Sequence, residues 1–232
     1  MTTDPFTPPD LEDAAALLTP DPLGLETGAR RLSSGVLHVA ARTDMPGCSG
    51  TMLEWWFRSA PDTERYRWWH PSDHVSSEWR ETSPTTHIGS THLVRERLGG
   101  GEIYDLAIHF VDPRELFGEA YDTALARGDV STVVAAQIGI GADPVRDSRG
   151  RPNMGRMAHI CRDVEGGAVL RSRFWLGAGL PAAPAELERL IPDELGPRLM
   201  QHAHTEYKSL TRFLPSLYAG EARETVTPPD LW

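Results

Sequence analysis

Residues 193–218, DELGPRLMQHAHTEYKSLTRFLPSLY, carry a clear helical pattern in this 232-residue chain. Apolar residues recur there every three or four positions, which is the spacing of one face of an α-helix. These residues are Leu195, Leu199, Leu210, Phe213, Leu214 and Leu217. Asp193 can cap the first turn, and Pro197 falls where a helix loses no backbone hydrogen bond. We therefore expect a long C-terminal helix from Asp193 to about Tyr218, with one face against a core.

Upstream of this helix, short apolar runs between turn residues predict strands. Residues 91–113, THLVRERLGGGEIYDLAIHFVDP, predict a hairpin around three glycines, and residues 155–177, GRMAHICRDVEGGAVLRSRFWLG, predict a second hairpin. Further strands are expected at residues 34–42, 50–59 and 131–141. The whole pattern predicts an α+β domain: an antiparallel sheet of roughly six or seven strands with the long helix lying across it.

The domain division follows from shifts in composition. Residues 1–34 are predicted to form a partly irregular N-terminal arm, with one short helical piece, DLEDAAALL, at residues 10–18. Residues 35–220 are expected to form a single domain, and residues 221–232 a C-terminal tail. A hydrophobic content of 40% and a charged content of 24% are typical of a globular protein with a real core.

Charge and segment content exclude several classes of partner. The formal net charge of -10 argues against nucleic acid or an anionic membrane, because both need a basic surface. No apolar run approaches the roughly 18 residues of a membrane helix, and the start MTTDPFTPPD lacks the features of a signal peptide. Cys48 and Cys161 are too few for a disulfide framework. A cytoplasmic protein is the simplest interpretation, and a homodimer stays an open option.

The predicted helix carries two polar residues on its core-facing side. The apolar stripe, continued by steps of three or four from Leu199, passes through His202 and Glu206 before it reaches Leu210. A buried carboxylate is costly unless a cation or strong donors meet it. The alternative is a slight roll of the helix that lets Glu206 pair with a Lys or Arg at the edge.

Two strands also place polar residues on inward faces. Alternation in HLVRERL puts Glu96 on the same face as His92, Val94 and Leu98. The alternative is a strand with both faces in water, and Glu102 is a weaker candidate because hairpin ends are usually exposed. In RMAHICRD, His159 shares a face with Met157 and Cys161, although a lone inward histidine is more often a hydrogen-bonded core residue.

A metal ion would account for all these inward groups at once. Neutral imidazoles and carboxylates are ligands of zinc and similar divalent ions, and a His/Glu pair one helical turn apart can give two ligands. The spacing HxxxE is common by chance. The stretch RYRWWHPSDHV, residues 65–75, adds two histidines and an aspartate beside two tryptophans. It is either a strand end with polar turn residues or the rim of a site, with one of Trp68 and Trp69 lining the pocket and the other packing behind it.

Four segments together resemble a known family. They are RWWHPSDH at 67–74, GSTHLVRERLGG at 89–100, HICRDVEGGAVLRSRFWLG at 159–177 and HAHTEYKSL at 202–210. From Glu54 to Tyr218 the chain resembles the 2,4-diacetylphloroglucinol hydrolase and phloretin hydrolase family. These are metal-dependent enzymes that cut the carbon–carbon bond between an acyl group and a polyhydroxylated aromatic ring. The resemblance implies a Bet v 1-like or START-like fold, in which a curved antiparallel sheet wraps around a long C-terminal helix.

The resemblance also implies roles for individual residues. The implied ligands of one divalent ion, with zinc first among the candidates, are His70, Glu96 or in its place Glu102, His202 and Glu206. His159 matches a catalytic histidine that moves a proton, and Asp73 and His74 would orient a ligand or read ring hydroxyls. The implied substrate-binding residues are Tyr66, Trp69 and Phe174. Phe174 stands where the family has a ring-binding tyrosine, which leaves the natural substrate open.

The expected activity is therefore hydrolysis of an acylphloroglucinol-like or related small aromatic ketone. The alternative is a START-like ligand-binding protein, or a cyclase that acts on a polyketide or another natural product. A binding module needs the cavity, but it does not need two histidines and two carboxylates on inward faces. The ligand types do not separate zinc from iron, manganese or cobalt.

Overall fold

The computed structural model describes residues 8–99, 101–141 and 143–220. The predicted tail at 221–232 and the first seven residues of the predicted arm lie outside this part of the chain. Within it, eight strands form one antiparallel sheet in the order β1-β2-β8-β7-β6-β5-β4-β3. The strands are β1 (Gly28–Arg31), β2 (Leu37–Pro46), β3 (His74–Arg80), β4 (Thr91–Glu96), β5 (Tyr104–Val111), β6 (Thr132–Ile140), β7 (Gly155–Val164) and β8 (Gly167–Leu176).

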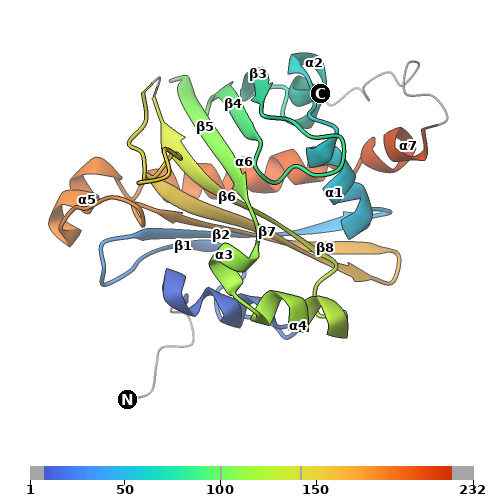
Figure 1. The fold of residues 1–232 in the computed structure, drawn as a ribbon, viewed down its shortest axis with the longest axis horizontal. Coiled ribbons are helices and arrows are strands. Elements are labelled where there is room, and N and C mark those ends of the chain that lie inside the picture. The colour runs from blue at the N-terminus through green and yellow to red at the C-terminus, as the bar shows by residue number, and fades with distance from the viewer. Residues whose placement is uncertain (1–7, 100, 142, 221–232) are drawn as a thin grey trace.

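Helices cover both faces of this sheet. They are η1 (Leu11–Leu18), α1 (Gly50–Arg58), α2 (Thr63–Trp69), α3 (Arg114–Phe117), α4 (Ala120–Arg127), α5 (Pro184–Leu190), α6 (Leu195–Leu210) and α7 (Leu214–Ala219). Figure 1 shows β3, β4 and β5 standing across the direction of β1 and β2, so that the sheet curls around α6. This is the predicted α+β arrangement of a Bet v 1-like fold: a curved antiparallel sheet around a long C-terminal helix.

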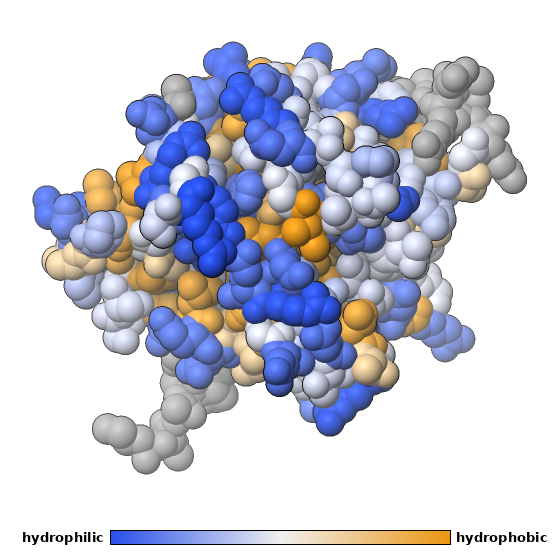
Figure 2. Space-filling model, viewed as in Figure 1, coloured by the Kyte–Doolittle hydropathy of each residue, from blue (hydrophilic) through white to orange (hydrophobic). Residues whose placement is uncertain are grey.

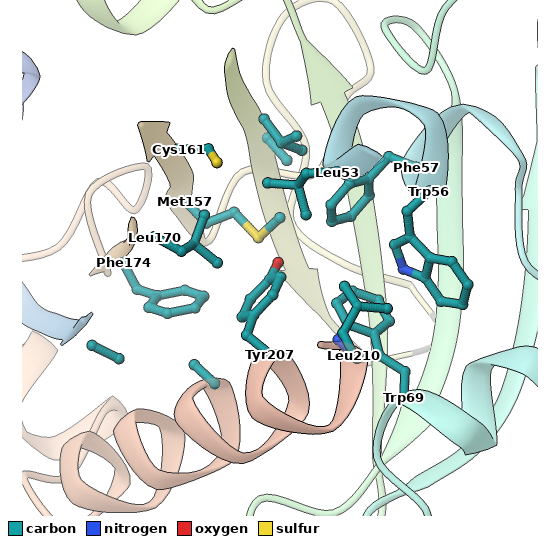
Figure 3. Close-up of a cluster of buried hydrophobic side chains, with 14 of the residues drawn as sticks. Leu53, Trp56, Phe57, Trp69, Met157, Cys161, Leu170, Phe174, Tyr207 and Leu210 are labelled. Atoms are coloured by element: carbon teal, nitrogen blue, oxygen red, sulfur yellow. The ribbon is translucent and has the colours of Figure 1, made fainter. Parts of the chain in front are cut away.

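The two faces of the sheet carry two hydrophobic clusters. The larger cluster lies between the sheet and the helices α1, α2, α6 and α7, and the smaller one lies under η1, α3 and α4. Figure 3 shows the larger cluster, with Tyr207 projecting from α6 toward Met157 beside Phe174. A strand of alternating pattern buries one face, whereas β6 and β8 are buried almost throughout because both of their faces are covered.

Both predicted hairpins are confirmed, as β4–β5 and β7–β8, and the strands expected at 34–42 and 131–141 are confirmed as β2 and β6. The strand expected at 50–59 is wrong, because these residues form helix α1. Ser49 caps that helix by accepting a hydrogen bond from the backbone N–H of Met52. Trp55, Trp56 and Phe57 are consecutive and all buried, and packing of this aromatic run outweighs its preference for strands.

Two further expectations about local structure need correction. Residues 63–69 form helix α2 and not the end of a strand, with Asp62 capping the helix by accepting from the N–H of Arg65. The single helix expected from Asp193 to Tyr218 is divided into α6 and α7. Pro215 explains the division, since it has no N–H to donate and its ring clashes with the preceding turn of a continuous helix.

Helix α6 lies very close to the start of the sheet. A Cβ atom added at Gly196 would lie 2.5 Å from Cβ of Ala29, so only glycine allows this approach of α6 to β1. The helix also contacts β2 along its length, and His204 Nδ1 lies 3.2 Å from Oγ1 of Thr43. The close packing fixes which face of α6 turns toward the interior.

Candidate metal centre and pocket

Helix α6 carries the two predicted inward residues, His202 and Glu206. Both are buried, and Nε2 of His202 lies 4.0 Å from Oε2 of Glu206. Lys208 is exposed and His204 is half-buried, as expected for the outer flank. The predicted orientation of the helix is therefore confirmed, and Glu206 lies away from the helix edge where a surface Lys or Arg would meet it.

Strand β4 brings a third group to the same place. Glu96 is buried together with His92, Val94 and Leu98, which confirms the predicted inward face. Oε2 of Glu96 lies 3.8 Å from Nε2 of His202. Glu102, the alternative candidate, is exposed beyond the end of β4.

Tyr66 on α2 holds the Glu96 carboxylate in place. The Tyr66 hydroxyl donates a hydrogen bond of 2.5 Å to Oε2 of Glu96. Tyr66 is 2% exposed, and burial raises its pKa well above the ordinary value, with the charge of Glu96 adding to the rise. The residue predicted to bind substrate therefore lies in the pocket wall with its hydroxyl bonded to Glu96.

His74, the first residue of β3, supplies a fourth group. Its Nε2 lies 3.7 Å from Oε2 of Glu96 and 3.6 Å from Oε2 of Glu206. Its Nδ1 lies 2.8 Å from the backbone carbonyl oxygen of Tyr66, and since a carbonyl only accepts, Nδ1 carries the proton. The lone pair of the neutral ring is then on Nε2, which is buried and has no hydrogen-bond partner among the described residues.

His70, the first histidine of HPSDH, lies beside both His202 and His74, and its ring centroid is 5.5 Å from that of His74. The rings of His70 and His202 stack with centroids 4.6 Å apart, and Nε2 of His70 lies 3.6 Å from Oδ2 of Asp73. The structure thus brings His74, rather than the predicted His70, against both glutamates. His70, Asp73 and His202 form a second group of three with the spacing for a metal ion.

Asp73 lies behind His202 as seen from the two glutamates. Its Oδ2 accepts a hydrogen bond from Nδ1 of His202 at 3.1 Å and another from the backbone N–H of Gly99 at 3.1 Å. A carboxylate that holds one nitrogen of an imidazole leaves the other nitrogen as a ligand. Asp73 therefore turns Nε2 of His202 toward Glu96 and Glu206.

The site is short of positive charge. Burial raises the pKa of Glu206 to about 8, with His202 opposing and Glu96 adding to the rise. Burial alone would lower the pKa of His202, but Glu96 and the hydrogen bond to Asp73 outweigh it and raise the pKa to about 9. For His74, burial lowers the pKa well below its ordinary value.

These atoms form a donor set that fits a divalent cation. The ligand atoms of His74, His202 and Glu206 lie within 4.8 Å of one another. With Glu96 they give two imidazole nitrogens and two carboxylate oxygens, a set that zinc and similar ions bind. A cation there would also satisfy the unpartnered Nε2 of His74 and offset the buried carboxylates.

A largely apolar pocket opens beside this cluster. It is lined by Glu96, His202 and Glu206 where it meets the cluster, and elsewhere mainly by apolar side chains of the sheet and the helices. Trp69 and Phe174, both predicted to contact substrate, line it. Trp69 lines the pocket, whereas Trp68 packs against Phe213 with ring centroids 6.0 Å apart. This confirms the expectation that one of the two tryptophans lines the pocket and the other packs behind it.

His159 lies in the floor of this pocket, on β7. Its Nδ1 lies 2.9 Å from Oγ of Ser172, and its ring stacks against Phe57 with centroids 6.2 Å apart. Burial lowers the pKa of His159 to about 3, so the ring is neutral. It is both the hydrogen-bonded core histidine of the simpler interpretation and a residue of the pocket wall.

Sequence reasoning missed several residues of the wall. The sequence pattern predicts a strand for Phe57, so it does not indicate that Phe57 lies in α1 and lines the pocket beside His159. His92 was placed on the inward face but given no role, and it lines the pocket with Nε2 2.8 Å from Oγ of Ser77. The inward alternation of β4 was the signal that could have found it.

Fold and site together define an α+β protein with a largely apolar pocket and a candidate metal centre in its wall. The chain belongs to the DAPG hydrolase family: it matches the family model described as DAPG hydrolase PhiG domain over residues 7–219. Among the described residues, every helix is too short or too polar to cross a bilayer.

Two curated relatives are similar along most of the chain. A 2,4-diacetylphloroglucinol hydrolase from a Pseudomonas species is 29% identical, with 95% of this chain and 78% of the relative covered. Phloretin hydrolase from Eubacterium ramulus is 26% identical, with 82% and 70% covered. Solved structures similar to this one include Ara h 8.0201, with a TM-score of 0.46, 12% identity, and 78% of this chain and 99% of that chain covered. Human STARD10 has a TM-score of 0.43 and 9% identity, with 96% and 87% covered.

Proposed function

We propose that this protein is a metal-dependent hydrolase that cleaves the carbon–carbon bond between an acyl group and a polyhydroxylated aromatic ring. The observation that carries the proposal is the convergence of His74, Glu96, His202 and Glu206 in the wall of an apolar pocket. The family membership supports it, since the named relatives act on 2,4-diacetylphloroglucinol and phloretin. A ligand-binding module or a cyclase needs the pocket, but it gives no reason for the four buried groups.

In this proposal His74, Glu96, His202 and Glu206 hold one divalent cation, with zinc the first candidate for two nitrogen and two oxygen donors. The cation would act as a Lewis acid on the acyl carbonyl of the bound ketone. His74 takes the place that the family resemblance implied for His70, because Nε2 of His74 faces both glutamates.

The surrounding residues position these four. Asp73 orients His202, the Tyr66 carbonyl orients His74 and the Tyr66 hydroxyl holds Glu96. Each of these three ligand side chains is held by a hydrogen bond to a neighbouring residue, and such bonds keep the metal-binding atoms in a productive geometry. In this proposal Asp73 acts through His202 and does not read ring hydroxyls.

We assign the proton transfer to His159. Hydrolysis adds one water: its oxygen bonds to the acyl carbon, the bond from that carbon to the ring breaks, and a proton goes to the ring carbon. A carbon leaving group is poor unless it is protonated as it departs. His159 is neutral and lies in the pocket floor with Nδ1 bonded to Ser172, which leaves Nε2 as the nitrogen that can take up and deliver a proton. The aromatic walls from Phe57, Trp69 and Phe174 exclude bulk water around the ring.

The test measures metal content and hydrolysis together. Elemental analysis of the purified protein should find close to one divalent ion per chain, and Glu206→Gln should remove it. Glu102→Gln is the matched control, because Glu102 is an exposed glutamate between β4 and β5. Acylphloroglucinols should be converted to a carboxylic acid and the deacylated phenol by the wild type and the control. A folded Glu206→Gln protein that keeps both metal and activity would overturn the proposal.

A further inference from the structure

The pocket has two parts of different chemistry. Its inner part is aromatic: Phe57 and Phe174 contact His159, and Trp69 and Phe110 contact Phe57. Its outer part is lined by aliphatic and methionine side chains alone. The buried members of this outer part are Leu98, Ile138, Leu176 and Leu199.

Helix α6 gives the order of these parts along the pocket. Leu195, Leu199, His202 and Glu206 line it from successive turns. At 1.5 Å of rise per residue, Leu195 lies about 10 Å along the helix axis from His202. The cluster of histidines and glutamates therefore lies about two turns inward from the start of the helix.

The mouth of the pocket is at the outer end. Ile140 is 39% exposed, and the other partly exposed lining residues are Leu106, Ile108, Met154 and Leu195. The strand register places Leu106 opposite Ile140 and Ile108 opposite Ile138. Figure 2 shows hydrophobic side chains gathered between hydrophilic ones near the middle of the face that β5 and β6 cross in Figure 1.

We propose, on the basis of the proposed function, that the substrate class is aryl ketones with a long apolar acyl chain. The ring lies in the inner aromatic part beside His159, the carbonyl lies at the cluster, and the chain extends past Leu199 to the mouth at Leu195. Stacking on aromatic side chains suits the ring. The outer part offers no side-chain donor or acceptor among the lining residues, so a polar chain would lose its hydration without a partner there.

Chain length is the variable that tests this class. Acylphloroglucinols with unbranched chains from acetyl to octanoyl are titrated into the purified protein, with binding followed by tryptophan fluorescence and hydrolysis by kcat/KM. Affinity should rise about fourfold per added methylene while the chain is being buried, and then level off once the chain reaches solvent. A hydroxyl at the end of a mid-length chain should cancel most of that gain.

A variant that fills the outer part of the pocket tests where the acyl chain binds. Leu199→Trp fills the outer part and should lower the ratio of octanoyl to acetyl affinity by tenfold or more. Leu190→Trp is the control, because Leu190 is 59% exposed on α5 and should leave this ratio unchanged. The series on the wild type gives the same answer if Leu199→Trp does not fold.

The outcomes separate this inference from the hydrolase proposal. Tighter binding of longer acyl chains without any hydrolysis supports the inferred class of ligand and the placement of its chain, and defeats the hydrolase proposal. Hydrolysis of the acetyl compound with affinity independent of chain length overturns the substrate class and leaves the hydrolase in place. An unchanged affinity ratio in folded Leu199→Trp also overturns the placement of the chain.

Discussion

Oδ2 of Asp73 lies 3.1 Å from Nδ1 of His202, while Nε2 of the same ring faces Glu96 and Glu206. The contact joins the turn after α2 to the middle of α6, and Gly99 donates to the same oxygen of Asp73. The carboxylate thus sets both the position and the tautomer of His202.

Asp73→Asn should therefore weaken binding of the divalent ion by roughly 10- to 100-fold, as is usual for partners of ligand histidines. The amide keeps the size of the side chain but loses its charge, so it holds the imidazole less firmly. Competition with a chromophoric chelator measures the change. Asp105→Asn, at an exposed aspartate on β5, is the control. Equal affinity in both variants would show that Asp73 has no part in positioning His202.

The two histidines of HPSDH should differ in their effect on metal binding. His74→Gln removes the nitrogen that faces both glutamates, and we expect a loss larger than about 100-fold, beyond the range for outer partners. His70→Gln removes a ring that stacks on His202 without facing the glutamates, and we expect a change below about tenfold. Elemental analysis and chelator competition on both proteins decide the matter. The reverse order would assign the ion to the group of His70, Asp73 and His202.

The contrast between these two histidines shows where sequence reasoning stops. The helical period alone aligns His202 and Glu206 with Leu199 and Leu210, and strand alternation alone turns Glu96 inward, so these three positions were predictable. The choice between His70 and His74 depends on the turn after α2, where the N–H groups of Asp73 and His74 both bond to the carbonyl of His70. A turn of this kind is set by tertiary packing, which a local pattern does not contain.

The strands and helices show the same limit. Hairpins with glycines between alternating runs were found, because the turn and the period are both local signals. Helix α1 was missed because Trp55, Trp56 and Phe57 favour strands locally, and burial of all three on neighbouring elements decides otherwise. The short strand β1 has little apolar pattern and is held by pairing with β2, so its sequence carries no sign of it.

Glu26 should contribute strongly to stability from the other side of the sheet. Its carboxylate pairs with Arg171 at 2.7 Å and with Arg173 at 3.4 Å, and both arginines are buried on β8. Glu26→Gln leaves two buried guanidinium groups without their counter-charge, and we expect a loss of about 3–5 kcal/mol. Urea unfolding measures it, with the exposed Glu165→Gln as control. A loss of unfolding free energy no greater than that of the control would mean that the backbone carbonyls around Arg171 are enough to stabilise the buried guanidinium groups.

The ion pair between Glu26 and Arg171 should make the stability of the folded protein depend on pH. In the folded protein burial raises the pKa of Glu26, but the hydrogen bond and charge of Arg171 outweigh burial and hold the pKa below the ordinary value of 4.5. The stabilisation from Glu26 is therefore fully present above pH 4.5 and is lost as the pH falls through the lower, folded pKa. Urea midpoints measured between neutral pH and acid should fall more steeply in the wild type than in Glu26→Gln. Parallel curves would exclude Glu26 as a source of the acid sensitivity.

Gly196→Ala should destabilise the protein and also weaken metal binding. In an open helix this change is stabilising by up to about 1 kcal/mol, because alanine is the better helix former. Here the new Cβ would lie 2.5 Å from Cβ of Ala29, and the overlap forces α6 away from β1. We expect a net loss of about 1–3 kcal/mol, the usual result of overpacking.

Because α6 carries His202 and Glu206, the displacement should also lower affinity for the divalent ion. Thermal unfolding and chelator competition test the two effects on one protein. Gly101→Ala is the matched control, since no atom lies within 4 Å of a Cβ at Gly101, and it should change neither measurement. A stabilised Gly196→Ala protein would show that the contact with Ala29 relaxes without moving the helix.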